Sequence, residues 1–185
     1  MSLCQRVARQ MQDRVEIQAM AHFTIQCLSY VRLPMAWADE HRVQQVLENL
    51  LENAIKYSPE GGVIELLVYP TDRSLAWEDN IIDTTEEQGA SQISITVRDH
   101  GIGIPQWQQS MVFEPFLRLP QSASRQISGV GLGLYIARKL IEAMHGTITL
   151  KSSSGQGTSI TLTLPIATAA TSIATAQSTT DKVLL

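Results

Sequence analysis

The 185-residue sequence lacks several features that mark large classes of proteins. No apolar run approaches the roughly 18 to 20 residues that a membrane-spanning helix needs, and no secretory signal opens the chain. Positive charge is not in excess, because the formal net charge is −4, which argues against a surface made for nucleic acid or anionic lipid. We therefore expect a soluble protein with no nucleic-acid partner and no direct membrane insertion of this chain.

Cysteine is scarce as well. Cys4 and Cys27 are the two cysteines, and they lack the spacing of metal ligands. Such a lone pair is typical of reduced thiols in the cytosol, so we expect no disulfide and a cytoplasmic location. The hydrophobic fraction, by contrast, is ordinary at 44%, which is enough for one domain with a real core.

The stretch from Val43 to Tyr57 carries two stripes along one predicted helix. Its apolar residues recur at the steps of an amphipathic helix. They are Val43, Val46, Leu47, Leu50, Leu51, Ala54 and Ile55. At roughly 100° per residue, Asn49, Asn53 and Lys56 fall in a narrow arc away from that stripe. Amide oxygens suit a hard cation such as magnesium, and lysine suits phosphate oxygens. A solvated face is the commoner explanation of three such residues alone, so the pattern needs support from elsewhere.

One supporting stretch follows a predicted strand of alternating apolar residues over 93–97. The strand runs directly into Asp99, Gly101 and Gly103. A carboxylate followed by two glycines one residue apart lets a planar ligand reach the backbone, although an ordinary Asp-x-Gly turn is the alternative.

A second stretch has glycines at positions 129, 131 and 133 and leads into a helix predicted over 135–145. Glycines at a helix start expose backbone N–H groups where the helix dipole is positive, which suits an anionic phosphate. The stretch is neither a Rossmann fingerprint nor a P-loop, because it follows a loop and Gly-Lys-Ser/Thr is absent from the chain. We expect the helix to stop at Gly146 as a C′ glycine. Its predicted buried face consists of Leu132, Ile136, Leu140, Ala143 and Met144.

Periodicity and turn residues predict the remaining elements. These are a helix over 3–21, strands over 22–28 and 63–69, a helix from the N-cap Asp39 to Tyr57, and a hairpin of strands over 147–151 and 158–164. We expect residues 1–21 to be the end of a truncated upstream element and residues 22–165 to form the domain. Residues 70–91 are acidic and without clear period, which indicates an exposed insertion. Residues 166–185 lack both period and aromatics, and we expect a disordered tail.

Four motifs in this order resemble those of the ATP-binding catalytic domain of sensor histidine kinases, within the wider family of Bergerat-fold ATPases. Residues 49–57 resemble the family's N box, 99–103 its first glycine box, 113–116 its F box and 129–133 its second glycine box. The resemblance covers roughly residues 39–165. It implies an α/β (α+β) two-layer sandwich, with a mixed, largely antiparallel sheet and helices on one face.

The resemblance also implies a role for individual residues, with ATP and Mg²⁺ as cofactors. Asp99 would accept a hydrogen bond from the adenine amino group and so select ATP over GTP. Asn53 would bind magnesium. Asn49 and Lys56 would face the phosphates, and Arg118 would reach the terminal phosphates, so that these three form the catalytic set.

Other positions complete the implied nucleotide site. Tyr57 is similar to a ring packed beside the adenine, although a core aromatic at the helix end is a nearly equal alternative. The glycines would bring N–H groups to the phosphates and let a lid over 106–128 close. The full implied set is Asn49, Asn53, Lys56, Tyr57, Asp99, Gly101, Gly103, Arg118, Gly129, Gly131, Gly133 and Leu134.

One position separates branches of the family. Hydrolysing members, and the serine kinases that bind sigma factors, carry a glutamate base where this sequence has Asn49. An amide cannot take a proton, which is expected when the acceptor is an imidazole, already a nucleophile at neutral pH. The resemblance thus implies transfer of the γ-phosphoryl group of ATP to a histidine.

The acceptor histidine is not evident in this sequence. His22, His41, His100 and His145 match no phosphoacceptor context, so we expect the acceptor on a separate dimerisation domain of the parent protein. A response regulator would act downstream, and the parent could be anchored in the inner membrane. Two alternatives stay open: a hydrolysing Bergerat-fold ATPase or serine kinase, and a non-catalytic nucleotide-binding or docking module.

Overall fold

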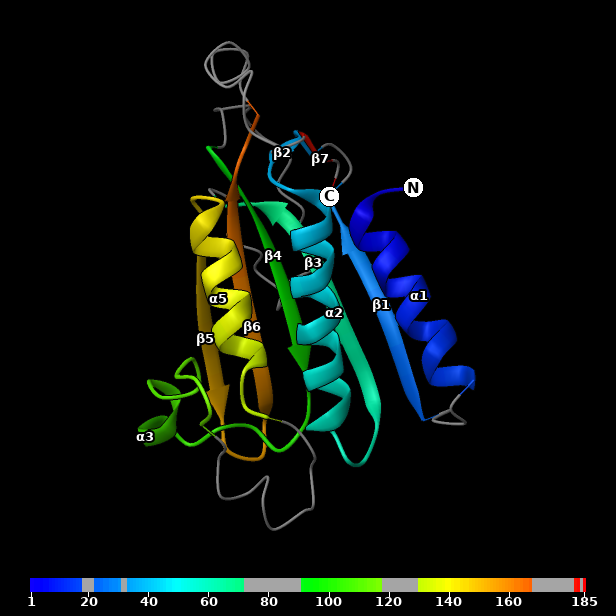
Figure 1. Ribbon diagram of the computed structural model, residues 1–185. Helices are drawn as coiled ribbons and strands as arrows, with labels where there is room; N and C mark the ends of the chain where they lie inside the picture. The colour runs from blue at the N-terminus through cyan, green and yellow to red at the C-terminus, as the bar shows by residue number, and fades with distance from the viewer. Residues whose placement is uncertain (18–21, 31–32, 72–90, 118–129, 168–181, 184) are drawn as a thin grey trace.

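The computed structural model describes residues 1–17, 22–30, 33–71, 91–117, 130–167, 182–183 and 185. Its main feature is a five-stranded sheet with helices packed against one face (Figure 1). The three longer helices in the described part are α1 (Leu3–Ile17), α2 (Glu40–Lys56) and α5 (Gly133–Ala143). The predicted two-layer α/β sandwich is confirmed.

The sheet is mixed and largely antiparallel, with the strand order β1-β3-β4-β6-β5. Its strands are β1 (Phe23–Ser29), β3 (Gly62–Pro70), β4 (Gln92–Asp99), β5 (Thr147–Ser153) and β6 (Gly157–Pro165). β1 pairs in parallel with β3, and the other neighbours are antiparallel. The register of β4 and β6 places Asp99 opposite Thr158. Residues far apart in the sequence therefore meet at this end of the sheet.

Helix α2 has the start and the buried face that the sequence predicts. The Asp39 side chain caps its first turn by accepting a hydrogen bond from the Arg42 N–H at 3.1 Å. The predicted apolar stripe is buried against the sheet, except that Ile55 is partly exposed. Burying one such side chain fully stabilises the fold by about 1.5–3 kcal/mol, which fixes the rotation of the helix. That rotation leaves its polar face free to line a cavity.

Helix α5 is rotated relative to the prediction. Ile136 was expected on the buried face, yet 42% of it is exposed, and Ala143 is exposed as well. The buried residues are Ala137, Ile141 and Met144. Apolar residues surround much of this helix, so more than one stripe satisfies helical periodicity. Packing against the sheet selected one of them.

The end of α5 also differs from the prediction of a C′ glycine. His145, not Gly146, adopts the left-handed conformation, with φ of 61°. The Gly146 N–H still donates to the Ile141 carbonyl oxygen at 3.0 Å. A Cβ at position 146 would lie 2.1 Å from the Thr163 carbonyl oxygen on β6. Glycine is needed here because the chain passes close to the neighbouring strand.

Helix α1 covers the β1 end of the sheet. Its buried residues join the same core cluster as those of α2 and the central strands. The Gln12 side-chain oxygen accepts a hydrogen bond from the Ile25 N–H of β1 at 2.8 Å. Ile17 is 84% exposed, so the buried face of this helix ends at Val15. Residues 18–21 of the predicted helix lie outside the described residues.

The C-terminal segment was expected to be disordered from residue 166. In the described part of that segment, β7 (Lys182–Val183) pairs antiparallel with β2 (Ala36–Trp37), and Leu185 is buried. These residues differ from the expectation because Leu185 packs into the hydrophobic core beside the paired strands. Residues 168–181, and 72–90 of the predicted insertion, lie outside the described residues. No helix in the described ranges is long and apolar enough to cross a membrane.

Candidate functional site

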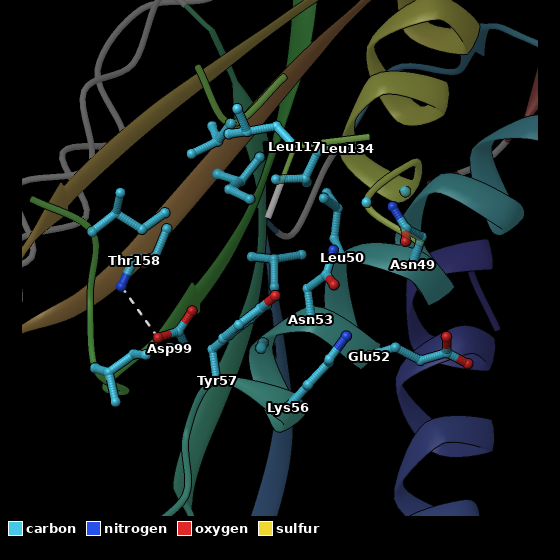
Figure 2. A pocket seen from close by; sticks show the side chains of 18 of the residues that line it. Asn49, Leu50, Glu52, Asn53, Lys56, Tyr57, Asp99, Leu117, Leu134 and Thr158 are labelled. Carbon is cyan, nitrogen blue, oxygen red and sulfur yellow. Dashed lines mark hydrogen bonds between the residues drawn. The ribbon is translucent and has the colours of Figure 1, made fainter. Parts of the chain in front are cut away.

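A cavity of about 460 Å³ lies between α2, α5 and the adjoining ends of β4 and β6 (Figure 2). Most of the predicted binding residues line it: Asn49, Asn53, Lys56, Tyr57, Asp99, Gly103, Gly131, Gly133 and Leu134. Gly101 lies outside its wall, and Arg118 and Gly129 lie outside the described residues. Side chains from three separate stretches of sequence therefore face one space.

At one end of the cavity, the Asp99 carboxylate is held by two backbone groups. Its Oδ1 accepts hydrogen bonds from the Gly101 N–H at 2.9 Å and the Thr158 N–H at 3.2 Å. Its second oxygen has no such donor in the described part of the chain and lies on the cavity side in Figure 2. Burial raises the pKa of Asp99, and the two N–H donors oppose that shift. The free oxygen can accept a hydrogen bond from a ligand.

At the other end, the polar face of α2 meets the start of α5. The Asn49 Nδ2 is buried without a hydrogen-bond partner among the described residues. A Cβ at Gly133 would lie only 2.3 Å from the Asn49 Oδ1, so a larger residue at this position would force the Asn49 side chain to move. An unpaired buried amide is costly, which points to a ligand atom as its missing partner.

Helix α5 begins at Gly133, the last glycine of the second glycine box, and its N-terminus faces the cavity. Gly131, just before it, has φ of 77°, and its carbonyl oxygen accepts a hydrogen bond from the Phe116 N–H at 3.0 Å. This bond ties the F-box segment to the second glycine box. The first-turn N–H groups of α5 and its dipole favour an anion at this place.

The turn after β4 is built against the β5–β6 hairpin. Gly103 has φ of 63°, and a Cβ there would lie 1.9 Å from the Ser153 carbonyl oxygen. The Ile104 N–H donates to the Ser152 Oγ at 2.8 Å, and the Gly155 N–H donates to the Ile102 carbonyl oxygen at 2.8 Å. These contacts fix the wall of the cavity next to Asp99.

Gly101 has a packing role in this structure. A Cβ there would lie 2.1 Å from the Tyr57 carbonyl oxygen, which accepts a hydrogen bond from the Ile102 N–H at 3.0 Å. The Tyr57 side chain is itself only partly buried and lies on the cavity wall, with the Lys56 Nζ 5.5 Å from its ring centroid. This placement favours a ring beside a ligand over a ring in the core.

Several lining residues were not predicted. They include Val97 and Ile160 of the strands and, from other segments, Ile104, Val112, Leu117 and Val130. Thr158 also lines the cavity, and its N–H holds Asp99. The alternation over 158–164 predicts the strand and its hairpin partner β5, but it does not predict that β4 pairs with the other edge of the strand. Asp99 and Thr158 are 59 positions apart, and no local sequence pattern predicts a contact between them.

The cavity has a hydrogen-bond acceptor, the Asp99 carboxylate, at one end. At its other end it has two side-chain amides, the Lys56 ammonium group and the N-terminus of α5. The apolar walls between them suit a planar ring. The described part of the chain holds no cluster of three His, Cys, Asp or Glu side chains that could bind a metal ion alone. A cation here would therefore need oxygens from a bound ligand, together with amides such as Asn53.

Comparison with known proteins identifies the family. The model of the histidine kinase-, DNA gyrase B- and HSP90-like ATPases matches residues 38–168. The sensor histidine kinase WalK of Bacillus subtilis is 39% identical over 127 residues, covering 69% of this chain and 18% of WalK. The adaptive-response sensory kinase SasA of Synechococcus sp. (strain JA-3-3Ab) is 34% identical over 165 residues, covering 89% of this chain and 38% of SasA.

Solved structures agree with this result. Full-length ShkA in complex with AMPPNP has a TM-score of 0.67 and 28% identity, covering 90% of this chain and 30% of that protein. The nucleotide-free catalytic domain of histidine kinase ThkA, with a TM-score of 0.64 and 23% identity, covers 89% of this chain and shows the same fold. The chain spans less than two-fifths of the length of the curated relatives named above. It belongs to the histidine kinase-, DNA gyrase B- and HSP90-like ATPase family, as an ATP-binding catalytic domain of the histidine kinase type.

Proposed function

We propose that this chain binds Mg-ATP in the cavity between α2 and α5 and transfers the γ-phosphoryl group to a histidine on a separate dimerisation domain of its parent protein. One observation carries the proposal. At opposite ends of one cavity lie an Asp99 oxygen and an Asn49 amide nitrogen that have no hydrogen-bond partner among the described residues. Such an arrangement suits a ligand with a hydrogen-bond donor at one end and phosphate oxygens at the other.

The adenine would lie at the Asp99 end. Because both backbone donors bind the Oδ1 of Asp99, its other oxygen is left to accept a hydrogen bond from the adenine amino group. Guanine has a carbonyl oxygen at that position, which an ionised carboxylate would repel. The Tyr57 ring would pack beside the base. ADP would bind in the same way, since the base and the ribose are shared.

The phosphates would lie along Asn49, Asn53 and Lys56, close to the N-terminus of α5. Asn53 would hold Mg²⁺ through its amide oxygen, and the ion would neutralise part of the phosphate charge. Asn49 would supply a donor to a phosphate oxygen, and Lys56 a mobile positive charge. Arg118, outside the described residues, would reach the terminal phosphates. Positioning and charge neutralisation are the main requirements of phosphoryl transfer.

Histidine is the acceptor that this site suits best, because the position where a base would activate water is held by the amide of Asn49. Asn49 cannot take a proton. The neighbouring carboxylates are engaged elsewhere: Glu48 accepts a hydrogen bond from the Gln44 Nε2 at 2.8 Å, and Glu52 pairs with the Arg14 Nη1 at 3.1 Å. A cytoplasmic location and a downstream response regulator follow as parts of this proposal.

Calorimetry with Asp99→Asn and Asn53→Ala variants tests nucleotide binding. The unaltered chain should bind Mg-ATP and prefer adenine to guanine nucleotides. Asp99→Asn should weaken adenine nucleotide binding, and Asn53→Ala should remove its magnesium dependence. Unchanged binding in both variants would exclude the proposed roles, and a chain that binds no nucleotide would be a docking module instead.

Radiolabelled ATP tests the chemistry. The chain should hydrolyse ATP very slowly, should not label itself, and should label a histidine in a separately supplied dimerisation hairpin of its parent. The transfer would be slower than in the intact parent because the effective concentration of the hairpin is lower. Rapid hydrolysis by the chain alone would assign it to the hydrolysing branch. Labelling of His100 or His145 would place the acceptor within this chain.

A further inference from the structure

Two ion pairs join α1 to α2, and only one of them adjoins the nucleotide cavity. Arg6 pairs with Glu40 in the first turn of α2. Arg14 pairs with Glu52, with 3.1 Å between the Arg14 Nη1 and the Glu52 Oε1. Glu52 lines the cavity, whereas Glu40 does not. All four side chains are about half exposed, so the two pairs differ mainly in their position along α2.

Glu52 occupies a sensitive place on α2. It lies three residues after Asn49 and four before Lys56, both of which line the cavity. A glutamate four residues before a lysine is well placed to pair with it along a helix. Figure 2 shows the Glu52 carboxylate turned away from the cavity, toward α1, where Arg14 meets it.

A carboxylate at this rim has an electrostatic consequence for a polyphosphate. If Glu52 turned toward the cavity, its negative charge would repel the phosphates and compete with them for the Lys56 ammonium. The ion pair with Arg14 opposes both effects, because it orients the carboxylate outward and compensates its charge. Arg14 itself does not line the cavity.

We propose that Arg14 is a positioning residue for nucleotide binding, which acts by holding Glu52 away from the phosphate end of the cavity. The inference rests on the proposed function, since it requires phosphates along the Asn49–Lys56 face. It gives α1, none of whose described residues line the cavity, an influence on nucleotide affinity. The effect depends on phosphate charge and not on the adenine.

The test uses the full 185-residue chain, with Arg14→Gln, Arg6→Gln, Glu52→Gln and the double variant R14Q/E52Q. Calorimetry with Mg-ATP and with adenosine separates the phosphate end from the base. Arg14→Gln should weaken Mg-ATP binding roughly two- to fivefold at low salt, as expected for an exposed ion pair, and leave adenosine binding unchanged. The matched control Arg6→Gln removes the same charge between the same helices and should leave both affinities unchanged. The difference should shrink at high salt.

The double variant decides whether Arg14 acts through Glu52. With Glu52→Gln already present, Arg14→Gln should have no further effect, because the carboxylate that it controls is gone. An equal loss with and without Glu52→Gln would show direct attraction of the phosphates and overturn the inference. Equal behaviour of Arg14→Gln and Arg6→Gln, or parallel losses for ATP and adenosine with a lower Tm, would overturn it too. An unaltered chain that binds no Mg-ATP would instead overturn the proposed function, and this inference with it.

Discussion

Asp99 is a residue at which folding stability and ligand recognition oppose each other. Burial raises its pKa, so the folded chain binds a proton at this carboxyl more readily than the unfolded chain does. The ionised form therefore costs stability at neutral pH, and this cost begins to fall at the raised pKa and is gone below the ordinary pKa of an aspartate. Nucleotide recognition needs that ionised form as an acceptor. Mg-ATP binding should accordingly weaken on acidification at a higher pH than an ordinary aspartate would give.

The variant Asp99→Asn should separate these two effects. Its Oδ1 can still accept from Gly101 and Thr158, but the remaining group is an NH₂ donor that faces the adenine amino group. We expect Mg-ATP binding to fall about tenfold or more, and the Tm at pH 7 to rise by roughly 2–4 °C, the shift that about 1 kcal/mol produces. The Tm gain should vanish in acid. Thermal melts across pH and calorimetry measure this, and a lower Tm at pH 7 would contradict it.

Gly133 is a second residue whose importance for the site rests on a single contact, with the Asn49 side chain. Gly133→Ala adds a methyl group 2.3 Å from the Asn49 Oδ1, so the amide must rotate away. Alanine favours the helix by up to about 1 kcal/mol, which should keep stability unchanged or higher. We expect Mg-ATP binding to weaken severalfold while adenosine binding and the Tm are kept. Ile136→Ala in the same helix is the control, and equal ATP affinities in the two variants would refute the contact's role.

At the scale of elements, α5 shows that helical periodicity alone does not identify a buried face. Ile136 and Ile141 are the same residue type in one helix, but the first is 42% exposed and the second is fully buried. Ile141→Ala should cost about 2–5 kcal/mol of unfolding free energy, because it removes core packing. Ile136→Ala should change it by less than about 0.5 kcal/mol. Urea unfolding measures both free energies. Equal losses of unfolding free energy in the two variants would contradict the burial of Ile141 over Ile136.

At the scale of the whole molecule, α1 belongs to the same core as the nucleotide-binding elements. Met11 of α1 is buried in the cluster that contains Leu47 and Ile95. We expect Met11→Ala to lower the free energy of unfolding by about 2–5 kcal/mol and to leave a single cooperative transition. The exposed Arg9→Ala is the control. A separate early transition, seen by circular dichroism in Met11→Ala alone, would mean that α1 folds independently of the sheet.

Local sequence patterns were enough to predict α2 and most of the candidate site. Its apolar stripe, its Asp39 cap and its polar arc of Asn49, Asn53 and Lys56 are local patterns within a few helical turns. The order of the four motifs likewise indicated the family. Such features are predictable because helix periodicity, capping and glycine conformations depend on neighbouring residues.

The remaining features depend on contacts between residues that are distant in the sequence. The face of α5 followed from packing on the sheet, and the need for glycine at 146 followed from the nearness of Thr163. The second donor to Asp99 came from Thr158, 59 positions away, through the register of β4 and β6. The contact of Arg14 with Glu52 came from the packing of α1 on α2. Contacts between distant residues depend on how layers pack and strands pair, and short-range sequence patterns do not encode either.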